Sequence, residues 1–474
     1  MNLIYDIKDK PGFGKTLLFA IQQLLAIMAA TIAVPAIVGN GLSASAALFG
    51  AGVGTIVYLL FTKSSSPVFL GSSFAFIGSM FSAFGGAATL GLCEQAGYWG
   101  LIIGALMAGL VYVIIAIVVK FCGVNWIEKL MHPVIIGPTV AIIGLSLSGN
   151  AIGDLMKTNH LISAIDEAGN AITQAPAGSV YVCLICGLVT LAVTMLCSTY
   201  SKKIGRLIPF IIGILAGYVL ASIFAIIGYA SKNPALIVID YSALKALNFK
   251  SISGYISLPK FTFMLGGTTG LKAITGKYIV TLLTAYVPVA FVVFAEHLAD
   301  HKNLSSIIGK NLLEEPGLTR TLLGDGVGTM VSTVFGGCPN TTYGESIGCV
   351  AITRNASTIT IWACAILCII FSLISPLVAF LETIPSCVMG GVCIALYGFI
   401  AVSGFKMFQK VDLNKNRNLF VASVIFITGV GGMVVSFGAV EIRTVACALI
   451  LGILTNVMLS KEKDDEPETE NTAE

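Results

Sequence analysis

Runs of apolar residues, each roughly 20 residues long, recur along the whole of this 474-residue chain, and a run of that length can cross the hydrocarbon core of a bilayer as an α-helix. Charged residues make up only 11% of the sequence, against roughly 25% in an average soluble protein. The 51 glycines suit close contact between helices in lipid. The sequence therefore predicts an all-α polytopic membrane protein rather than a soluble one.

Fourteen spanning or half-spanning segments can be placed on the chain. An even number puts both chain ends on one side of the membrane. Most Lys and Arg residues fall in connections on the same side of the membrane as the N-terminus. The positive-inside rule therefore predicts that both termini are cytoplasmic. The acidic residues 461–474 are expected to form a disordered tail. The segments lie near 15–38, 43–62, 66–84, 98–121, 128–152, 179–199, 205–230, 277–300, 318–336, 338–353, 357–380, 385–405, 418–437 and 440–460.

Three further features of the sequence limit its function. The net charge of +3 is not gathered into a basic patch, so no nucleic-acid partner is expected. Cys183 and Cys186 form a C-x-x-C pair inside a membrane segment, where small packing residues are favoured over a metal or redox site. The long connection 231–276 mixes polar residues with short apolar runs and is predicted to be an ordered extracellular elaboration, to which the sequence assigns no role.

The chain divides into two halves of seven segments within residues 230–276. Since seven is odd, the second half must be inverted relative to the first. Inverted repeats are common in secondary transporters, which bind substrate near the membrane midplane at interrupted helices. The third segment of each half has such an interruption, in "SSSPVFLGSSFAFIGSM" and in "GCPNTTYGESIGCVAITR". The alternative is that both are ordinary helices that contain Gly and Pro.

Two glutamates lie deep in apolar segments, Glu296 in the eighth and Glu345 in the tenth. An ionisable group at membrane depth costs about 3 kcal/mol on insertion scales and usually marks a substrate pathway or a proton relay. Asp300 follows Glu296 by one turn and shares its helical face, while His297 and His301 share a neighbouring face. The alternative is that Asp300, His297 and above all His301 have already reached the cytoplasmic interface.

The chemistry of these groups favours one kind of solute. The two interrupted helices would present positive dipole ends, which repel a cation, and unpaired N–H groups, which donate to carbonyl groups of a solute. The two carboxylates would accept hydrogen bonds from N–H groups of the same solute. Uracil, a planar neutral molecule with both kinds of group, suits such a site, although other small solutes stay open on this reasoning. A buried glutamate that takes up a proton would couple transport to protons. Gln22 and Gln23 in the first segment either join the polar site or form hydrogen bonds between helices.

The stretch "GESIGCVAITR" resembles the motif of the nucleobase–ascorbate transporter (nucleobase–cation symporter) family, and within it the uracil permeases. In order along the chain, the motif consists of an acid or amide, a residue that is usually Asn, one variable residue, Gly, four variable residues, Thr and a basic residue. The defined positions are held here by Glu345, Ser346, Gly348, Thr353 and Arg354. The stretches "PNTTYGE", "LGSSFAF", "VVFAEH" and "PGLTRTLLGDG" are also similar to uracil permeases. The resemblance covers nearly the whole chain.

The resemblance implies a seven-plus-seven inverted repeat with short strands and half-helices in segments 3 and 10. A core domain would combine segments 1–4 and 8–11, and a gate domain would combine segments 5–7 and 12–14. The core would move against the gate as an elevator, and the gate domain would provide the contact of a homodimer. The implied boundaries are core 1–125, gate 126–276 with the connection 231–276, core 277–380, gate 381–460 and tail 461–474.

The resemblance also implies a site and a coupling ion. Glu296 and Glu345 would hold the nucleobase, Phe74 and Gly344 would donate backbone amides to it, and Tyr343 would line the site. Candidates for proton coupling are Glu296 itself, Asp300 and His297. No metal and no cofactor other than the coupling proton is expected. The predicted function is proton-coupled import of uracil across the cell membrane, and not an enzymatic reaction.

Three departures from the family pattern leave alternatives open. Gln22-Gln23 stands where the family has Gln-His, Ser346 replaces Asn, and Asp300 replaces a His that uracil permeases often have. Asp300 is found in some purine carriers, so a xanthine or uric acid permease is the nearest alternative, although Glu345 argues against it. A sulfate-permease-like anion transporter is less favoured because two carboxylates would repel an anion. A channel is less favoured than alternating access.

Overall fold

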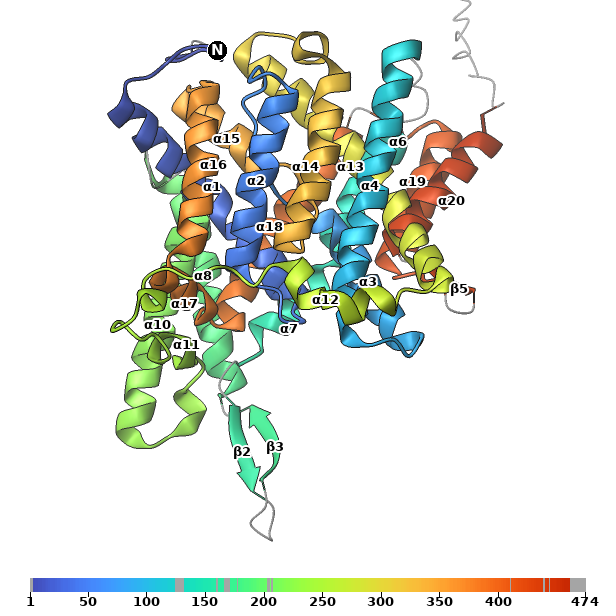
Figure 1. Ribbon diagram of the computed structural model, residues 1–474. Helices are drawn as coiled ribbons and strands as arrows, with labels where there is room; N and C mark the ends of the chain where they lie inside the picture. Colours follow the sequence, from blue (N-terminus) through green and yellow to red (C-terminus); the bar gives the residue numbers. More distant parts are fainter. Residues whose placement is uncertain are drawn as a thin grey trace, which may run out of the picture.

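Most of the chain is helical in the computed structural model (Figure 1), which describes residues 3–123, 132–158, 161–165, 171–176, 178–202, 205, 208–409, 411–437, 440–442 and 444–460. Among these residues, eight helical spans are long and apolar enough to cross a membrane. They are α1 (Phe13–Val38), α2 (Ala44–Phe61), α4 (Glu94–Cys122), α6 (Pro133–Ser146) with α7 (Ser148–Leu155), α8 (Val180–Tyr200), α10 (Pro209–Ser231), α13 (Gly276–Ile308) and α18 (Ser386–Phe408).

Helices that are shorter or less apolar occupy the remaining predicted segments, so that each of the fourteen overlaps at least one helix. They are η1 (Phe74–Phe76) with α3 (Ile77–Thr89), α14 (Leu318–Gly336), α15 (Gly344–Thr353), α16 (Thr358–Leu373) with α17 (Ser375–Glu382), α19 (Asn416–Val430) and α20 (Thr444–Met458). The chain is thus a multi-pass membrane protein. The predicted tail 461–474 lies outside the described residues.

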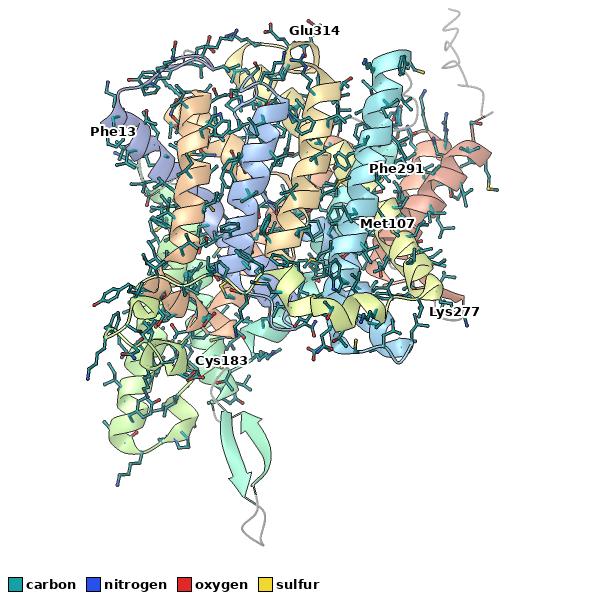
Figure 2. The ribbon with its side chains drawn as sticks, viewed as in Figure 1. Phe13, Met107, Cys183, Lys277, Phe291 and Glu314 are labelled. Atoms are coloured by element: carbon teal, nitrogen blue, oxygen red, sulfur yellow. The ribbon has the colours of Figure 1, made fainter. Side chains whose placement is uncertain are left out.

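The prediction that the eighth segment ends near residue 300 was wrong. The helix α13 continues to Ile308 and runs from Lys277 at one end of the molecule to the turn with Glu314 at the other (Figure 2). One face of this extension packs against the protein, because His301, Leu304 and Ile308 are buried, whereas Lys302, Asn303 and Ser306 are exposed.

Both interrupted segments contain a short strand, as the resemblance implied. Strand β1 (Leu70–Ser72) pairs antiparallel with β4 (Asn340–Thr342), with Gly71 opposite Thr341. Two more backbone bonds extend the pairing, from the Ser73 amide to the Pro339 carbonyl (2.9 Å) and from the Tyr343 amide to the Phe69 carbonyl (3.2 Å). The breaks in the two helices therefore satisfy each other's backbone groups, which is required of irregular chain at membrane depth.

Close packing of α3, α4 and α13 fixes the position of α13. A Cβ atom on Gly104 of α4 would lie 2.3 Å from the Tyr286 ring, and one on Gly100 would lie 2.0 Å from the Tyr278 hydroxyl. That hydroxyl donates to the Ala83 carbonyl of α3 at 2.6 Å. The glycines of α4 therefore let two tyrosines of α13 lie directly against its backbone.

The two ends of the molecule differ in what covers them (Figure 1). One end carries the N-terminus and the last turn of α20. The other end carries the strand pairs β2 (Leu161–Ile165)–β3 (Ala171–Pro176) and β5 (Val435–Phe437)–β6 (Val440–Ile442), together with the connection after α10. That connection is ordered, as predicted, and contains η2 (Pro234–Leu236), α11 (Ser242–Lys245), η3 (Ile252–Gly254) and α12 (Thr262–Lys272).

An N-terminal strap, residues 3–10, lies along the chain that joins α15 to α16. The Ile4 amide donates to the Arg354 carbonyl at 2.8 Å, and the Ala356 amide donates to the Tyr5 carbonyl at 2.9 Å. The Lys310 ammonium group forms an ion pair with Asp6. The far end of the half-helix α15 thus lies at the end of the molecule that carries the N-terminus.

Candidate functional site

All five residues predicted to bind substrate line one small cavity of about 50 Å³. It lies beside the strand pair and includes Phe74, Glu296, Tyr343, Gly344 and Glu345. These residues come from three separate parts of the chain, namely η1, α13 and the start of α15. The structure therefore brings together the residues that the resemblance implied.

Two helix starts adjoin this cavity. Phe74 is the first residue of η1, which leads into α3, and Gly344 is the first residue of α15. Because β1 and β4 are antiparallel, these helices begin at opposite ends of the strand pair. The amides of a first helical turn have no partner inside the helix, so both starts can donate hydrogen bonds to an acceptor in the cavity.

A tyrosine and a glycine fix the geometry between the two strands. The Tyr343 hydroxyl donates to the Ser72 carbonyl at 2.7 Å, and its side chain is buried. The ring lies against Gly71, where an added Cβ atom would be 2.3 Å from two ring carbons. Any larger residue than Gly at position 71 would therefore displace Tyr343 from the cavity wall.

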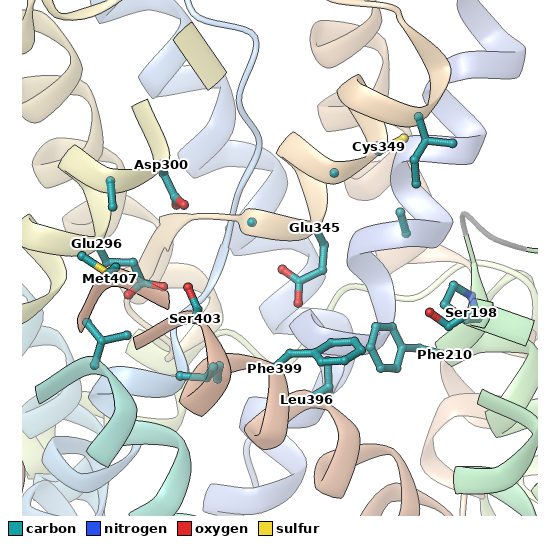
Figure 3. A pocket seen from close by; sticks show the side chains of 18 residues that line it. Ser198, Phe210, Glu296, Asp300, Glu345, Cys349, Leu396, Phe399, Ser403 and Met407 are labelled. Atoms are coloured by element: carbon teal, nitrogen blue, oxygen red, sulfur yellow. The ribbon is translucent and has the colours of Figure 1, made fainter. Parts of the chain in front are cut away.

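Three carboxyl groups point into one space (Figure 3). Glu296 and Asp300 extend from α13 and Glu345 extends from α15, and all three line a larger cavity of about 350 Å³. Asp300 accepts a hydrogen bond from the Thr342 hydroxyl at 2.7 Å, which ties α13 to the end of β4. Neither cavity has a Lys or Arg among its lining residues within the described part of the chain.

The larger cavity continues from the smaller one toward the end of the molecule that carries the N-terminus. Both cavities share Glu296, Gly344 and Glu345. The larger one then follows α15 past Gly348 to Ile352, close to where α15 meets the N-terminal strap. This cavity therefore extends toward that end of the molecule.

The proton-coupling candidate His297 does not line either cavity. Its Nδ1 lies 2.7 Å from a carboxylate oxygen of Asp325, and its Nε2 lies 3.0 Å from the Thr321 hydroxyl. Both partners belong to α14 and are fully buried, as is His297. His297 thus faces α14, away from the three carboxyl groups.

Sequence reasoning overlooked Asp325 and misplaced His301. Asp325 is a fully buried acid that lies in the Gly-rich run "LLGDGVG"; the signal that could have identified it is an acid within a predicted membrane segment. His301 is buried within the protein, and its Nε2 lies 2.8 Å from the Tyr58 hydroxyl. These residues form a second polar network on the far side of α13.

The two glutamines of the first segment differ in their surroundings. Gln23 is buried and donates a hydrogen bond to the Ser346 hydroxyl, which also accepts from the Phe69 amide at 3.0 Å. This confirms, for Gln23, the alternative that it bonds between helices. Gln22 is half-buried and lines neither of the two cavities.

The chemistry of the site follows from these groups. Carboxyl groups accept hydrogen bonds from N–H donors and exchange protons, and the helix starts donate to carbonyl oxygens. An anion would meet three carboxyl groups and no basic side chain from the described residues. No group of His, Cys, Asp and Glu side chains in that part of the chain is arranged to hold a metal ion.

Comparisons with known proteins identify similar transport proteins. The chain is 36% identical over 460 residues to the uracil permease of Bacillus caldolyticus, with 96% of this chain and 94% of that protein covered. It is 35% identical over 449 residues to the uracil permease of Escherichia coli K12, with 94% and 92% covered. These relatives are transport proteins and not enzymes.

Two solved structures share the fold. The transmembrane domain of the cyanobacterial bicarbonate transporter BicA superposes with a TM-score of 0.61 at 14% identity, covering 95% of this chain and 100% of that one. The murine anion transporter Slc26a9 in its inward-facing state gives 0.61 at 13% identity, covering 96% and 69%.

The family model Xan_ur_permease, described as a permease family, matches residues 14–437. The match covers most of the chain and includes both interrupted segments and the three carboxyl groups of the cavity. The chain therefore belongs to this permease family.

Proposed function

We propose that this protein imports uracil across the cell membrane together with a proton. The observation that carries the proposal is the facing pair Glu296 and Glu345 beside two helix starts (Figure 3). The ring N–H groups of uracil would donate to the two carboxyl groups. Its carbonyl oxygens would accept from the amides of Phe74 and Gly344, and Tyr343 would close one wall. The names of the relatives support the choice of uracil.

The coupling ion would be carried by the acids that line the cavity. Glu296 and Asp300 lie one turn apart on α13 and share the cavity with Glu345. A single added proton would lower the repulsion among three carboxyl groups and let one of them donate as well as accept. His297 is less suited to this role because it faces Asp325. No other cofactor is needed.

Alternating access would move one domain against the other. In the proposed arrangement, fourteen segments form a seven-plus-seven inverted repeat with cytoplasmic termini. The core, 1–125 and 277–380, would carry the site past a gate formed by 126–276 and 381–460, which would also form the homodimer contact. The extension of the larger cavity along α15 to Ile352, toward the side of the N-terminus, supports an inward-facing state for this structure.

Two other solutes are less well supported. The fold is shared with anion transporters, but the carboxyl groups of the cavity oppose an anion. A purine such as xanthine is the closer alternative, because Asp300 lines the larger cavity and offers a third acceptor to a larger ring system.

Uptake of labelled uracil by cells that lack their own carrier tests the proposal. We expect uptake that rises as the outside pH falls and that is insensitive to excess xanthine. Glu296→Gln should abolish uptake, whereas Glu314→Gln, at an exposed turn, should not change it. Absent uracil uptake, or strong competition by xanthine, would transfer the assignment to a purine carrier.

A further inference from the structure

The larger cavity contains an apolar region that the small solute of the proposed function would not fill. We call it the inner annex and define it by Phe210, Ile352, Phe399 and Met407. These four residues line the larger cavity but not the smaller one. They come from α10, α15 and α18, so the annex lies between the half-helix that carries Glu345 and two helices of the proposed gate.

An aromatic pair forms one wall of the annex. The rings of Phe210 and Phe399 have centroids 5.9 Å apart and an interplanar angle of 74°, in an edge-to-face arrangement. Phe210 is buried, but Phe399 has 56% of its surface exposed. Figure 3 shows both rings below the Glu345 side chain, in the lining of the same cavity. Aromatic rings associate favourably in edge-to-face or offset geometry, so the free surface of Phe399 can accept a third ring.

The chemistry of a pyrimidine indicates which ligand could use both regions. In the proposed function, the N–H and carbonyl groups of uracil face Glu296, Glu345 and the helix starts. Ring carbons 5 and 6 are then the positions without a hydrogen-bonding group. A substituent there can extend from the 50 Å³ cavity into the larger one, with which that cavity shares Glu296, Gly344 and Glu345.

We propose that the inner annex is a binding site for an aryl group attached to carbon 5 or 6 of a pyrimidine, and that such ligands are bound but not transported. This inference rests on the proposed function. The pyrimidine would lie against α13 and α15, while the aryl ring would lie against α10 and α18. A molecule that bridges the two sides would hold them apart and would not fit the small cavity when the site closes.

Binding to the purified full-length protein tests the annex directly. By titration calorimetry, we expect 5-benzyluracil or 6-benzyluracil to bind about tenfold more tightly than uracil, since one added aromatic contact is of that size. Phe399→Ala should remove this gain without changing the affinity for uracil. Phe420→Ala is a matched control, because Phe420 lies on α19 with 57% exposure and lines neither cavity. The thermal stability of both variants shows that they are folded.

A transport assay tests the second half of the proposal. In proteoliposomes, the benzyl compounds should block uracil uptake and should not accumulate. If uracil binds but neither isomer binds more tightly, or if Phe399→Ala and Phe420→Ala behave alike, the annex is refuted and the proposed function stands. If neither uracil nor the benzyl compounds bind, both are refuted. Accumulation of a benzyl compound would refute the claim that it is not transported.

Discussion

Replacing Gly71 with Ala should damage the site through one contact. A Cβ atom at this position would lie 2.3 Å from two ring carbons of Tyr343, so the ring must move. Overpacking of this kind costs about 1–3 kcal/mol. The shift also breaks the 2.7 Å hydrogen bond from the Tyr343 hydroxyl to the Ser72 carbonyl, which is worth about 1 kcal/mol. We therefore expect a total loss of about 2–4 kcal/mol.

The loss should be visible in both stability and binding. Gly71→Ala should lower the unfolding temperature in detergent. Because it also displaces Tyr343 from the cavity wall, it should weaken uracil binding, by a factor of ten for each loss of about 1.4 kcal/mol of contact energy. Gly78→Ala is the matched control, because an added Cβ atom on Gly78 meets nothing within 4 Å. In the Tyr343→Leu background, which removes the ring, Gly71→Ala should cost little more. Equal effects of Gly71→Ala and Gly78→Ala, or full additivity with Tyr343→Leu, would refute the reasoning.

Three further predictions concern the polar contacts around the site. Asp325→Leu should lower the free energy of unfolding by about 1–3 kcal/mol, because it leaves the buried His297 without its acceptor. Asp325→Asn keeps an acceptor and should cost much less. Equal melting temperatures of these two variants would contradict the prediction. Thr342→Val removes the hydroxyl bonded to a carboxylate of α13 and should weaken uracil binding about tenfold, while Thr342→Ser should preserve it. The hydrogen bond from Lys310 lowers the pKa of Asp6 below its usual 3.8. The ion pair between Lys310 and Asp6 is therefore complete above pH 3.8 and is lost as the pH falls through the lowered pKa of Asp6. Protease cleavage within the N-terminal strap should increase as the ion pair is lost, and Lys310→Met should remove this pH dependence.

The sequence predicted the site well where a residue's type alone was informative. Glu296 and Glu345 were found because an acid in an apolar run is rare, and both line the same cavity. The interruptions of the third and tenth segments were expected because Pro and Gly disfavour a continuous membrane helix, whereas the short strands in both segments were implied by the resemblance. The residues Phe74 and Gly344 depended on the resemblance, because their role lies in backbone amides that no side-chain pattern reveals.

Sequence reasoning was incomplete where the neighbours of a helix decide the outcome. His297 follows Glu296 by one residue, which turns its side chain about 100° around the helix axis, and only the position of α14 shows that Asp325 meets it there. The segment 277–300 was ended too early because His301 looked polar enough for an interface. In the folded protein Tyr58 provides a buried partner, and the helix continues to Ile308.

The pairing of β1 with β4 has a consequence for how the protein is made. Ser72 and Tyr343 are bonded although they lie 271 residues apart in the chain. During synthesis, Leu70–Ser72 is inserted long before Asn340–Thr342 exists, and unpaired backbone groups at membrane depth cost several kcal/mol each. The first half must therefore wait in the bilayer with this segment unfinished, shielded by water, by lipid headgroups or by the insertion machinery. A chain that stops before residue 340 should remain a substrate for membrane quality control, however well its long helices have inserted.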